Sequence, residues 1–189
     1  MADYATRRSL NPGGKERVAR AAARLILPGQ TVIVDGGTTN LAVVRQLPRD
    51  LDVTIVTHSP TIAVALVEHP AEIFLIGGRL FKHSAVTSGA SAVEAAAWVN
   101  ADLFLMGVTG VHESAGFTTG DADEAAMKRA LARRAADTYV LADSEKIGAA
   151  SPFEVLPIGD VAGLVTDADA STATVARLRE EGLATVHAD

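Results

Sequence analysis

The stretch "TVIVDGGTTNLAVV", residues 31–44, places β-branched apolar residues directly before an aspartate, two glycines, two threonines and a helical pattern. The apolar run predicts a buried strand, and the glycines allow a tight turn in which backbone N–H groups approach a bound group closely. We expect Thr38 or Thr39 to cap the following helix. Because a helix amino end attracts anions, Gly36, Gly37, Thr38 and Thr39 predict an anion site. An ordinary capped turn is the alternative.

Asp35 ends this strand beside the expected anion site and needs its own explanation. A carboxylate repels an anion, so we expect Asp35 to accept hydrogen bonds from ligand hydroxyls instead of contacting a phosphate. That combination fits a sugar phosphate. The alternative is an aspartate that binds backbone N–H groups of its own turn. Neither GxxxxGK[ST] nor GxGxxG occurs in the chain, which argues against a nucleotide ligand.

Short apolar runs and helical patterns alternate along the rest of the chain. Strands are expected at about 31–35, 53–57, 72–77, 102–107, 138–143 and 161–166, and helices at about 15–27, 38–47, 60–67, 90–99, 123–134 and 171–181. Loops are expected after 77 and after 107. The strands lack polar alternation, as they do when helices cover both faces of a sheet. The pattern predicts an α/β, Rossmann-like, mainly parallel sheet flanked by helices.

The expected strands end in polar or glycine-rich segments. In a parallel sheet these carboxyl ends lie along one edge, where α/β folds bind ligands. The candidates are Thr57 and His58 in "THSP", Gly77, Gly78 and Lys82 in "IGGRLFK", Gly107 in "MGVTG", and Asp143 and Lys146 in "ADSEK". A lysine such as Lys146 supplies a point charge to a phosphate, although a solvated loop is its alternative.

The segment "GDADEAAMKRAL", residues 120–131, concentrates carboxylates at a helix start. Asp121 and Glu124 have the spacing of a capping box, and Glu124 and Lys128 form an (i, i+4) pair. We favour this structural interpretation. The alternative is that Asp121, Asp123 or Glu124 moves a proton in a sugar-phosphate isomerase or deaminase.

Composition limits the class of protein. The 189 residues are 48% hydrophobic and 21% charged and include no cysteine, so we expect one soluble, cytoplasmic domain without disulfides. Six of the 17 basic residues but only two of the 23 acidic ones precede residue 25. The acidic remainder is a poor binder of nucleic acid, while residues 1–14 form a linker or basic arm. Five histidines without paired spacing predict no metal, and no cofactor is expected. Trp98 is expected in the core or at an interface.

Taken in order, several segments resemble the effector-sensing region of DeoR-family transcriptional regulators. They are "KERVARAAARLILPGQTVIVDGGTTNLAVVRQL", "TIVTHSPTIAVAL", "IFLIGGRLF", "GASAVEAA", "ADLFLMGVTGV", "GFTTGDADEAAMKRAL" and "VLADSEKIG", spanning about residues 15–167. The resemblance implies the fold shared with ribose-phosphate isomerase, glucosamine-phosphate deaminase and coenzyme A transferases. It also implies a phosphorylated sugar or related metabolite as effector, and self-association into a homo-oligomer.

Residue by residue, the resemblance implies that the turn at 36–39 holds the phosphate and that Asp35 meets sugar hydroxyls. It implies that "THS" and Gly77-Gly78 line the pocket. Glu124, Lys128, Asp143 and Lys146 match the family's acidic-helix and D-S-x-K positions. His58 stands where asparagine is common, and Gly36 replaces a frequent serine, so the preferred ligand is expected to differ.

The family's winged helix-turn-helix needs roughly 50 residues before the sensor, and only about 14 precede the first expected helix here. We therefore expect DNA contact only through a helix-turn-helix domain that this chain does not contain, either because the chain is an excised sensor, with Arg7 and Arg8 left from the linker, or because it is natural without one. We expect no membrane association. A regulatory sensor is the leading hypothesis; an isomerase or deaminase, and an interaction module with an empty pocket, are the alternatives.

Overall fold

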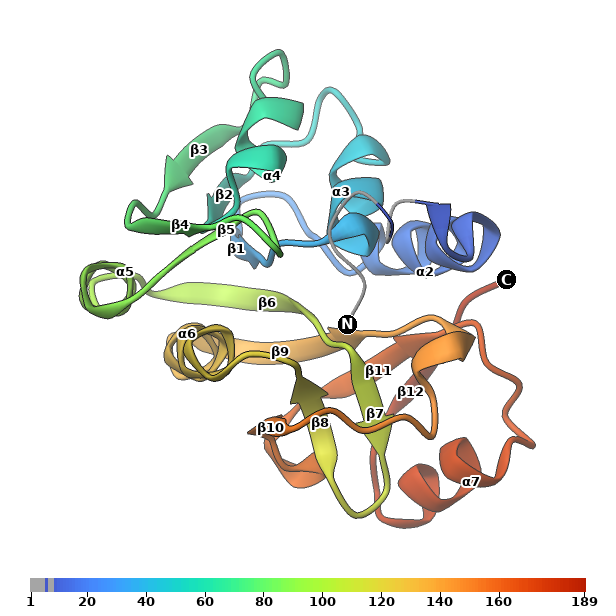
Figure 1. Ribbon diagram of the computed structural model, residues 1–189. Helices are drawn as coiled ribbons and strands as arrows, with labels where there is room; N and C mark the ends of the chain where they lie inside the picture. Colours follow the sequence, from blue (N-terminus) through green and yellow to red (C-terminus); the bar gives the residue numbers. More distant parts are fainter. Residues whose placement is uncertain (1–5, 7–8) are drawn as a thin grey trace.

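A seven-stranded parallel sheet forms the centre of the protein (Figure 1). The structure is a computed structural model that describes Thr6 and residues 9–189, so Arg7 and Arg8 lie outside the described residues. The strand order is β12-β11-β9-β6-β1-β2-β3, and every neighbouring pair is parallel. The strands are β1 (Thr31–Val34), β2 (Thr54–Thr57), β3 (Glu72–Leu75), β6 (Ala101–Gly107), β9 (Ala135–Leu141), β11 (Gly163–Thr166) and β12 (Thr185–His187). The predicted fold class is confirmed.

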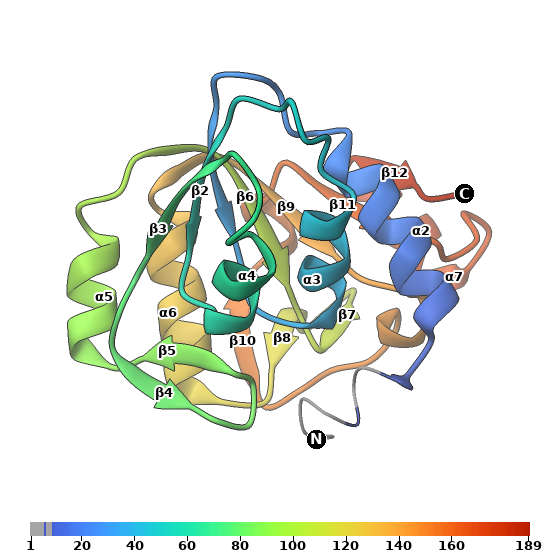
Figure 2. The ribbon, with the colours of Figure 1, turned by 90° about the horizontal axis from the view of Figure 1, so that it is seen from above.

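Helices cover both faces of the sheet. In Figure 1, α2, α3 and α4 lie above it and α5, α6 and α7 below it; Figure 2 shows α3 between α2 and α4. The bounds are α2 (Pro12–Ala23), α3 (Thr38–Arg45), α4 (Pro60–Ala65), α5 (Ala90–Ala96), α6 (Ala122–Ala132) and α7 (Ala173–Glu180). Two 3-10 helices, η1 (Ser144–Lys146) and η2 (Ile158–Asp160), lie in loops. Among the described residues, no helix is long and apolar enough to cross a membrane.

Two apolar cores lie on opposite faces of the sheet. Along β1, Val32 and Val34 pack on the α2–α4 side while Ile33 packs on the α5–α7 side. β6 alternates in the same way, with Leu105 on the first side and Phe104 on the second. Each fully buried aliphatic or aromatic side chain contributes about 1.5–3 kcal/mol. Burial on both faces explains why these strands show no polar alternation.

The strand order reverses between β1 and β6. From β1 the chain moves outward to β2 and β3, and it then returns to β6 and continues outward on the other side. The helix after β1, α3, lies on one face, and the first helix after β6, α6, lies on the other. This divergence opens a crevice at the carboxyl ends of β1 and β6, where open α/β sheets bind ligands.

Additional strands form in the two segments expected as loops and in the segment between β9 and β11. β4 (Arg79–Phe81) and β5 (Val86–Ser88) form a hairpin, and β7 (Gly110–His112), β8 (Gly116–Thr119) and β10 (Phe153–Leu156) form a small antiparallel sheet. These strands have three or four residues each, too few to show a periodic pattern.

Two other sequence-based expectations need correction. Helix α2 begins at Pro12 and not, as the sequence predicted, at Lys15. The side chain of Asn11 caps it by accepting a hydrogen bond from the Gly14 N–H at 3.1 Å. Proline at the first helical turn lacks an N–H that would be unpaired there anyway. The core position expected for Trp98 is wrong, because its side chain is 85% exposed; its place at an interface stays a prediction.

The two-sided core predicts a clear contrast between two leucines. Leu131 on α6 is fully buried, so Leu131→Ala is expected to lower the free energy of unfolding by about 2–5 kcal/mol. Leu27, which is 56% exposed, is the matched control. Leu27→Ala should change the free energy of unfolding by less than about 1 kcal/mol. Urea unfolding followed by circular dichroism measures both. Equal effects would contradict the assignment of α6 to the core.

Candidate functional site

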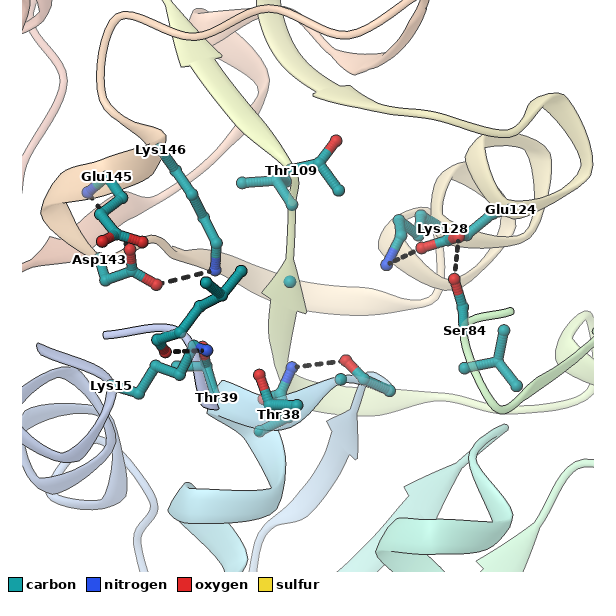
Figure 3. A pocket seen from close by; sticks show the side chains of 17 residues that line it. Lys15, Thr38, Thr39, Ser84, Thr109, Glu124, Lys128, Asp143, Glu145 and Lys146 are labelled. Atoms are coloured by element: carbon teal, nitrogen blue, oxygen red, sulfur yellow. Dashed lines mark hydrogen bonds and ion pairs between the residues drawn. The ribbon is translucent and has the colours of Figure 1, made fainter. Parts of the chain in front are cut away.

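A cleft of about 230 Å³ lies at the carboxyl ends of the central strands, where the strand order reverses (Figure 3). It is lined by the turn after β1, the start of α3, the end of β6, one face of α6, and η1. The lining residues are Leu10, Lys15, Gly36, Gly37, Thr38, Thr39, Asn40, Ser84, Val86, Gly107, Val108, Thr109, Glu124, Lys128, Asp143, Glu145 and Lys146. Segments that are far apart in the sequence, between residues 10 and 146, therefore converge on one small volume.

The carboxylate of Asp35 lies fully buried beneath this cleft and has four polar partners. Its Oδ1 accepts from the Gly36 N–H at 2.7 Å and lies 2.7 Å from Nε2 of His58. Its Oδ2 accepts from the Gly107 N–H at 2.8 Å and from the ammonium of Lys128. These partners lie in the turn after β1, directly after β2, at the end of β6 and on α6. Asp35 therefore joins both sides of the point at which the strand order reverses.

Charge compensation decides the ionisation of the buried pair. Burial alone would raise the pKa of Asp35, but Lys128 and His58 hold the pKa of that carboxyl well below its usual range. Burial alone would lower the pKa of Lys128, but Asp35 and Glu124 raise it above its usual value. Both groups are charged at neutral pH, and each makes burial of the other possible.

Glu124 connects α6 to the β4–β5 hairpin. One of its oxygens lies 3.3 Å from Nζ of Lys128, and the other accepts from the Ser84 hydroxyl at 2.9 Å. The (i, i+4) pair expected from the sequence is confirmed, but it is buried and not on a solvated helix surface. Asp121 caps α6 by accepting from the Glu124 N–H at 2.9 Å, so the N-cap expected at Asp121 is confirmed.

The amino end of α3 opens onto the cleft. Gly37 is its N-cap, with a φ of 106° that favours glycine, and no side chain of residues 9–189 caps the helix. The expectation that Thr38 or Thr39 caps α3 is therefore wrong, because both are helical residues. Within the described part of the chain, the buried Thr39 Oγ1 and Asn40 Oδ1 have no hydrogen-bond partner. Buried polar atoms are normally paired, so these two oxygens point to a ligand or water in the cleft.

Lysines surround this helix end. Figure 3 shows Lys146 and Lys128 reaching toward the cleft from opposite sides, with Thr38 and Thr39 below them. Nζ of Lys146 lies 3.1 Å from Oδ2 of Asp143. Helix N–H groups and several ammonium groups converging on one volume make a strong site for an anion.

The structure groups the sequence-predicted residues into three sets. Those that line the cleft are Gly36, Gly37, Thr38, Thr39, Gly107, Glu124, Lys128, Asp143 and Lys146. Those that are fully buried outside the lining are Asp35, Thr57 and His58. The remaining residues also lie outside the lining. Asp121 caps α6; Gly77 and Gly78 connect β3 to β4, and Lys82 lies in the turn of the β4–β5 hairpin.

Sequence reasoning missed several lining residues. Asn40 follows the "GGTT" turn directly, and its polar side chain on the first turn of α3 was an available signal. Leu10, Lys15 and Ser84 carried no such signal, because distant packing brings them to the cleft. Among the described residues, no cluster of histidine and carboxylate side chains could hold a metal ion.

Comparison with known proteins identifies the family. A family model described as the DeoR C terminal sensor domain matches residues 10–168. The chain belongs to this family. It is 32% identical over 170 residues to the uncharacterized HTH-type transcriptional regulator FruR of Bacillus subtilis, covering 90% of this chain and 68% of that protein. It is also 32% identical over 164 residues to the HTH-type transcriptional regulator GlpR of Haloferax volcanii, covering 87% and 64%.

Other relatives and structures agree with this membership. The glycerol-3-phosphate regulon repressor of Escherichia coli is 28% identical over 155 residues, covering 82% of this chain and 62% of that protein. This DeoR sensor domain thus spans about two thirds of the length of the curated relatives it matches. Ribose 5-phosphate isomerase A of Methanocaldococcus jannaschii has the same fold, with a TM-score of 0.54 at 17% identity over 72% of this chain and 55% of that one.

The buried Asp35 predicts a specific dependence of stability on pH. Its lowered pKa means that ionised Asp35 stabilises the fold above about pH 4, and that this contribution is lost as the pH falls through the folded-state pKa. Asp35→Asn should therefore be less stable than the wild type at pH 7, and the difference should shrink below about pH 4.

Denaturant unfolding at several pH values measures this difference. Asp50→Asn is the control, since Asp50 is exposed, and it should match the wild type throughout. A gap between the wild type and Asp35→Asn that stays constant with pH would contradict the ionised state of Asp35.

Proposed function

We propose that this sensor domain binds a small phosphorylated sugar or polyol in the cleft and reports its presence within a transcriptional regulator. The observation that carries the proposal is the open amino end of α3, where Thr39 Oγ1 and Asn40 Oδ1 are buried and have no hydrogen-bond partner among the residues that the structure describes. Unpaired buried oxygens are costly in an empty site, and a ligand with polar groups satisfies them. The family membership supports a binding role.

The cleft has chemically different ends. One end combines the helix N–H groups of α3 with Lys146 and Lys15, which fits a phosphate. The other end presents Glu124, Lys128 and Ser84, which accept from and donate to hydroxyls. The volume of about 230 Å³ is at the small end of ligand sites, so a short phosphorylated polyol fits better than a nucleotide.

The name of one relative helps to choose a first probe. The Escherichia coli relative is named for a glycerol-3-phosphate regulon. Glycerol 3-phosphate has one phosphate and two hydroxyls, which match the two ends of the cleft. It is therefore the first compound to test, with inorganic phosphate as the probe for the phosphate end alone.

The ligand would contact the amino-terminal stretch of the chain directly. Leu10 and Lys15 line the cleft, and Nζ of Lys15 donates to the Leu10 carbonyl at 2.5 Å. Arg17 on the same helix binds Asp167 at 2.7 Å, and Asp167 accepts from the Ser144 N–H at the start of η1. A ligand in the cleft would thus change the contacts that hold residues 10–17. It would shift these residues from one conformation to another by as much as its affinities for the two conformations differ.

Self-association is part of the proposal. Large apolar side chains are exposed on α4, on β3 at the edge of the sheet, and on β4, which Figure 1 places at one end of the molecule. They are Val64, Val67, Phe74, Leu75 and Leu80. A group of exposed apolar residues along an edge strand marks an interaction surface. A second copy of the chain is the partner that we propose for it.

The positions of the three carboxylates that could act as a base favour a sensor role over a sugar-phosphate isomerase. Of the three candidate bases, Asp121 caps α6 and the Asp123 side chain is 59% exposed beside Arg79. Glu124 faces the cleft but is held by Lys128 and Ser84. A sensor returns its ligand unchanged, so NMR spectra of glycerol 3-phosphate or ribose 5-phosphate kept with the protein should show no product. Turnover of either compound would favour the enzyme.

Two threonines provide a matched test of the binding site. Thr39 and Thr119 are both buried with an unpartnered hydroxyl in the described structure, but only Thr39 lines the cleft. Thr39→Val should weaken glycerol 3-phosphate binding about tenfold without lowering stability, because valine keeps the shape and removes one ligand contact. Thr119→Val should bind like the wild type. Isothermal titration calorimetry measures affinity, and thermal unfolding measures stability.

A second comparison tests the phosphate end. Lys146→Met should lower the affinity for both glycerol 3-phosphate and inorganic phosphate by at least about tenfold, because it removes a positive charge beside the bound anion. Lys82→Met, outside the cleft lining, should leave both affinities unchanged. No heat with any phosphorylated sugar or polyol, or equal effects of the two variants, would reject the proposed function.

A further inference from the structure

His58 is a fully buried histidine whose two ring nitrogens both face acceptors. Its Nδ1 lies 2.9 Å from the carbonyl oxygen of Thr87 on β5, and its Nε2 lies 2.7 Å from Oδ1 of Asp35. A carbonyl oxygen only accepts hydrogen bonds, so Nδ1 must carry a proton. The protonation of Nε2 then depends on whether Asp35 holds a proton of its own.

The surroundings of Asp35 leave no place for a proton on the carboxylate. Besides His58, its oxygens face the N–H groups of Gly36 and Gly107 and the ammonium of Lys128, all of which donate. A protonated carboxyl would point its O–H at one of these donors or turn it toward Nε2 at the expense of the ion pair with Lys128. Nε2 therefore donates to Asp35, and the ring of His58 holds two protons.

The charge of the buried cluster leads to the same conclusion. Asp35, Glu124 and Lys128 are each at most 5% exposed. With a neutral His58 this cluster carries one uncompensated negative charge, which is costly in a buried position. With a charged His58 the two carboxylates and two cations balance. The other group that binds the ring is the backbone carbonyl of Thr87 on β5, which does not titrate.

We propose that His58 is a doubly protonated positioning residue that holds Asp35 away from the cleft and thereby leaves Glu124 as the carboxylate that meets ligand hydroxyls. The second half of this statement rests on the proposed function. His58 occupies Oδ1 of Asp35, while Gly107 and Lys128 occupy Oδ2. No acceptor on Asp35 is left for a sugar hydroxyl, so the side chain at position 58 selects the carboxylate that a ligand encounters.

NMR spectroscopy of the wild-type protein tests the protonation directly. In ¹⁵N-labelled protein, the ring-nitrogen signals of His58 are identified as those that disappear in a His58 variant. At pH 7 both nitrogens should have the chemical shifts of protonated ring nitrogens. A shift typical of an unprotonated ring nitrogen at pH 7 would overturn the proposal. This measurement needs no ligand, so it stands or falls separately from the proposed function.

Two variants test the effect on ligand selection. Glutamine extends its amide to about the position of Nε2, so His58→Gln keeps a donor to Asp35; the shorter asparagine reaches only the Nδ1 position, so His58→Asn releases Oδ1. His58→Asn should raise the affinity for glycerol 3-phosphate relative to inorganic phosphate about tenfold, whereas His58→Gln should leave that ratio within about threefold of the wild type.

The ratio of affinities separates positioning from a structural role. A general loss of folding would weaken both ligands together, and circular dichroism would detect it. An unchanged ratio in His58→Asn, or the same change in both variants, would overturn the role of His58 in ligand selection. If the wild type bound neither compound, the proposed function and this selection role would both fail, and the NMR result alone would decide the protonation of His58.

Discussion

The arrangement of the cleft depends on one buried carboxylate. Asp35 directly follows β1 at the point where the strand order reverses, and both of its oxygens contact polar groups from four segments: the turn after β1, the residue after β2, the end of β6, and α6. Each of these segments packs against the apolar cores. Apolar packing is not directional, however, so it sets the relative positions of the segments at the crevice less exactly than hydrogen bonds do. A buried ion is stable only with good geometry around it, so Asp35 imposes that geometry.

This arrangement divides the functional groups of the cleft between two roles. Asp35, His58 and Lys128 satisfy one another and hold the floor of the cleft in place. Thr39 and Asn40 at the start of α3 keep oxygens that no group in the described part of the chain pairs with. Paired buried groups give rigidity, and unpaired ones give affinity for a partner. The division explains how a stable fold carries a site that is complete only with a ligand.

The sequence predicted the parallel sheet and the elements around Asp35 because long apolar runs and the "DGGTT" turn are local signals. It did not predict the β4–β5 hairpin, whose strands have three residues each, or the arrival of Lys15 at the cleft, which depends on α2 packing beside α3. The role expected for Asp35, contact with sugar hydroxyls, stays a prediction, and our proposal for His58 and Glu124 offers a different role. Only the folded chain brings His58 and Lys128 to it, and these partners occupy its oxygens.

The most direct test of the account is a crystal structure of this domain with glycerol 3-phosphate at a saturating concentration. The account predicts the phosphate within hydrogen-bonding distance of the backbone N–H groups of Thr38 and Thr39, with the hydroxyls toward Glu124. A cleft that stays empty at saturation, or a phosphate bound away from the start of α3, would contradict it.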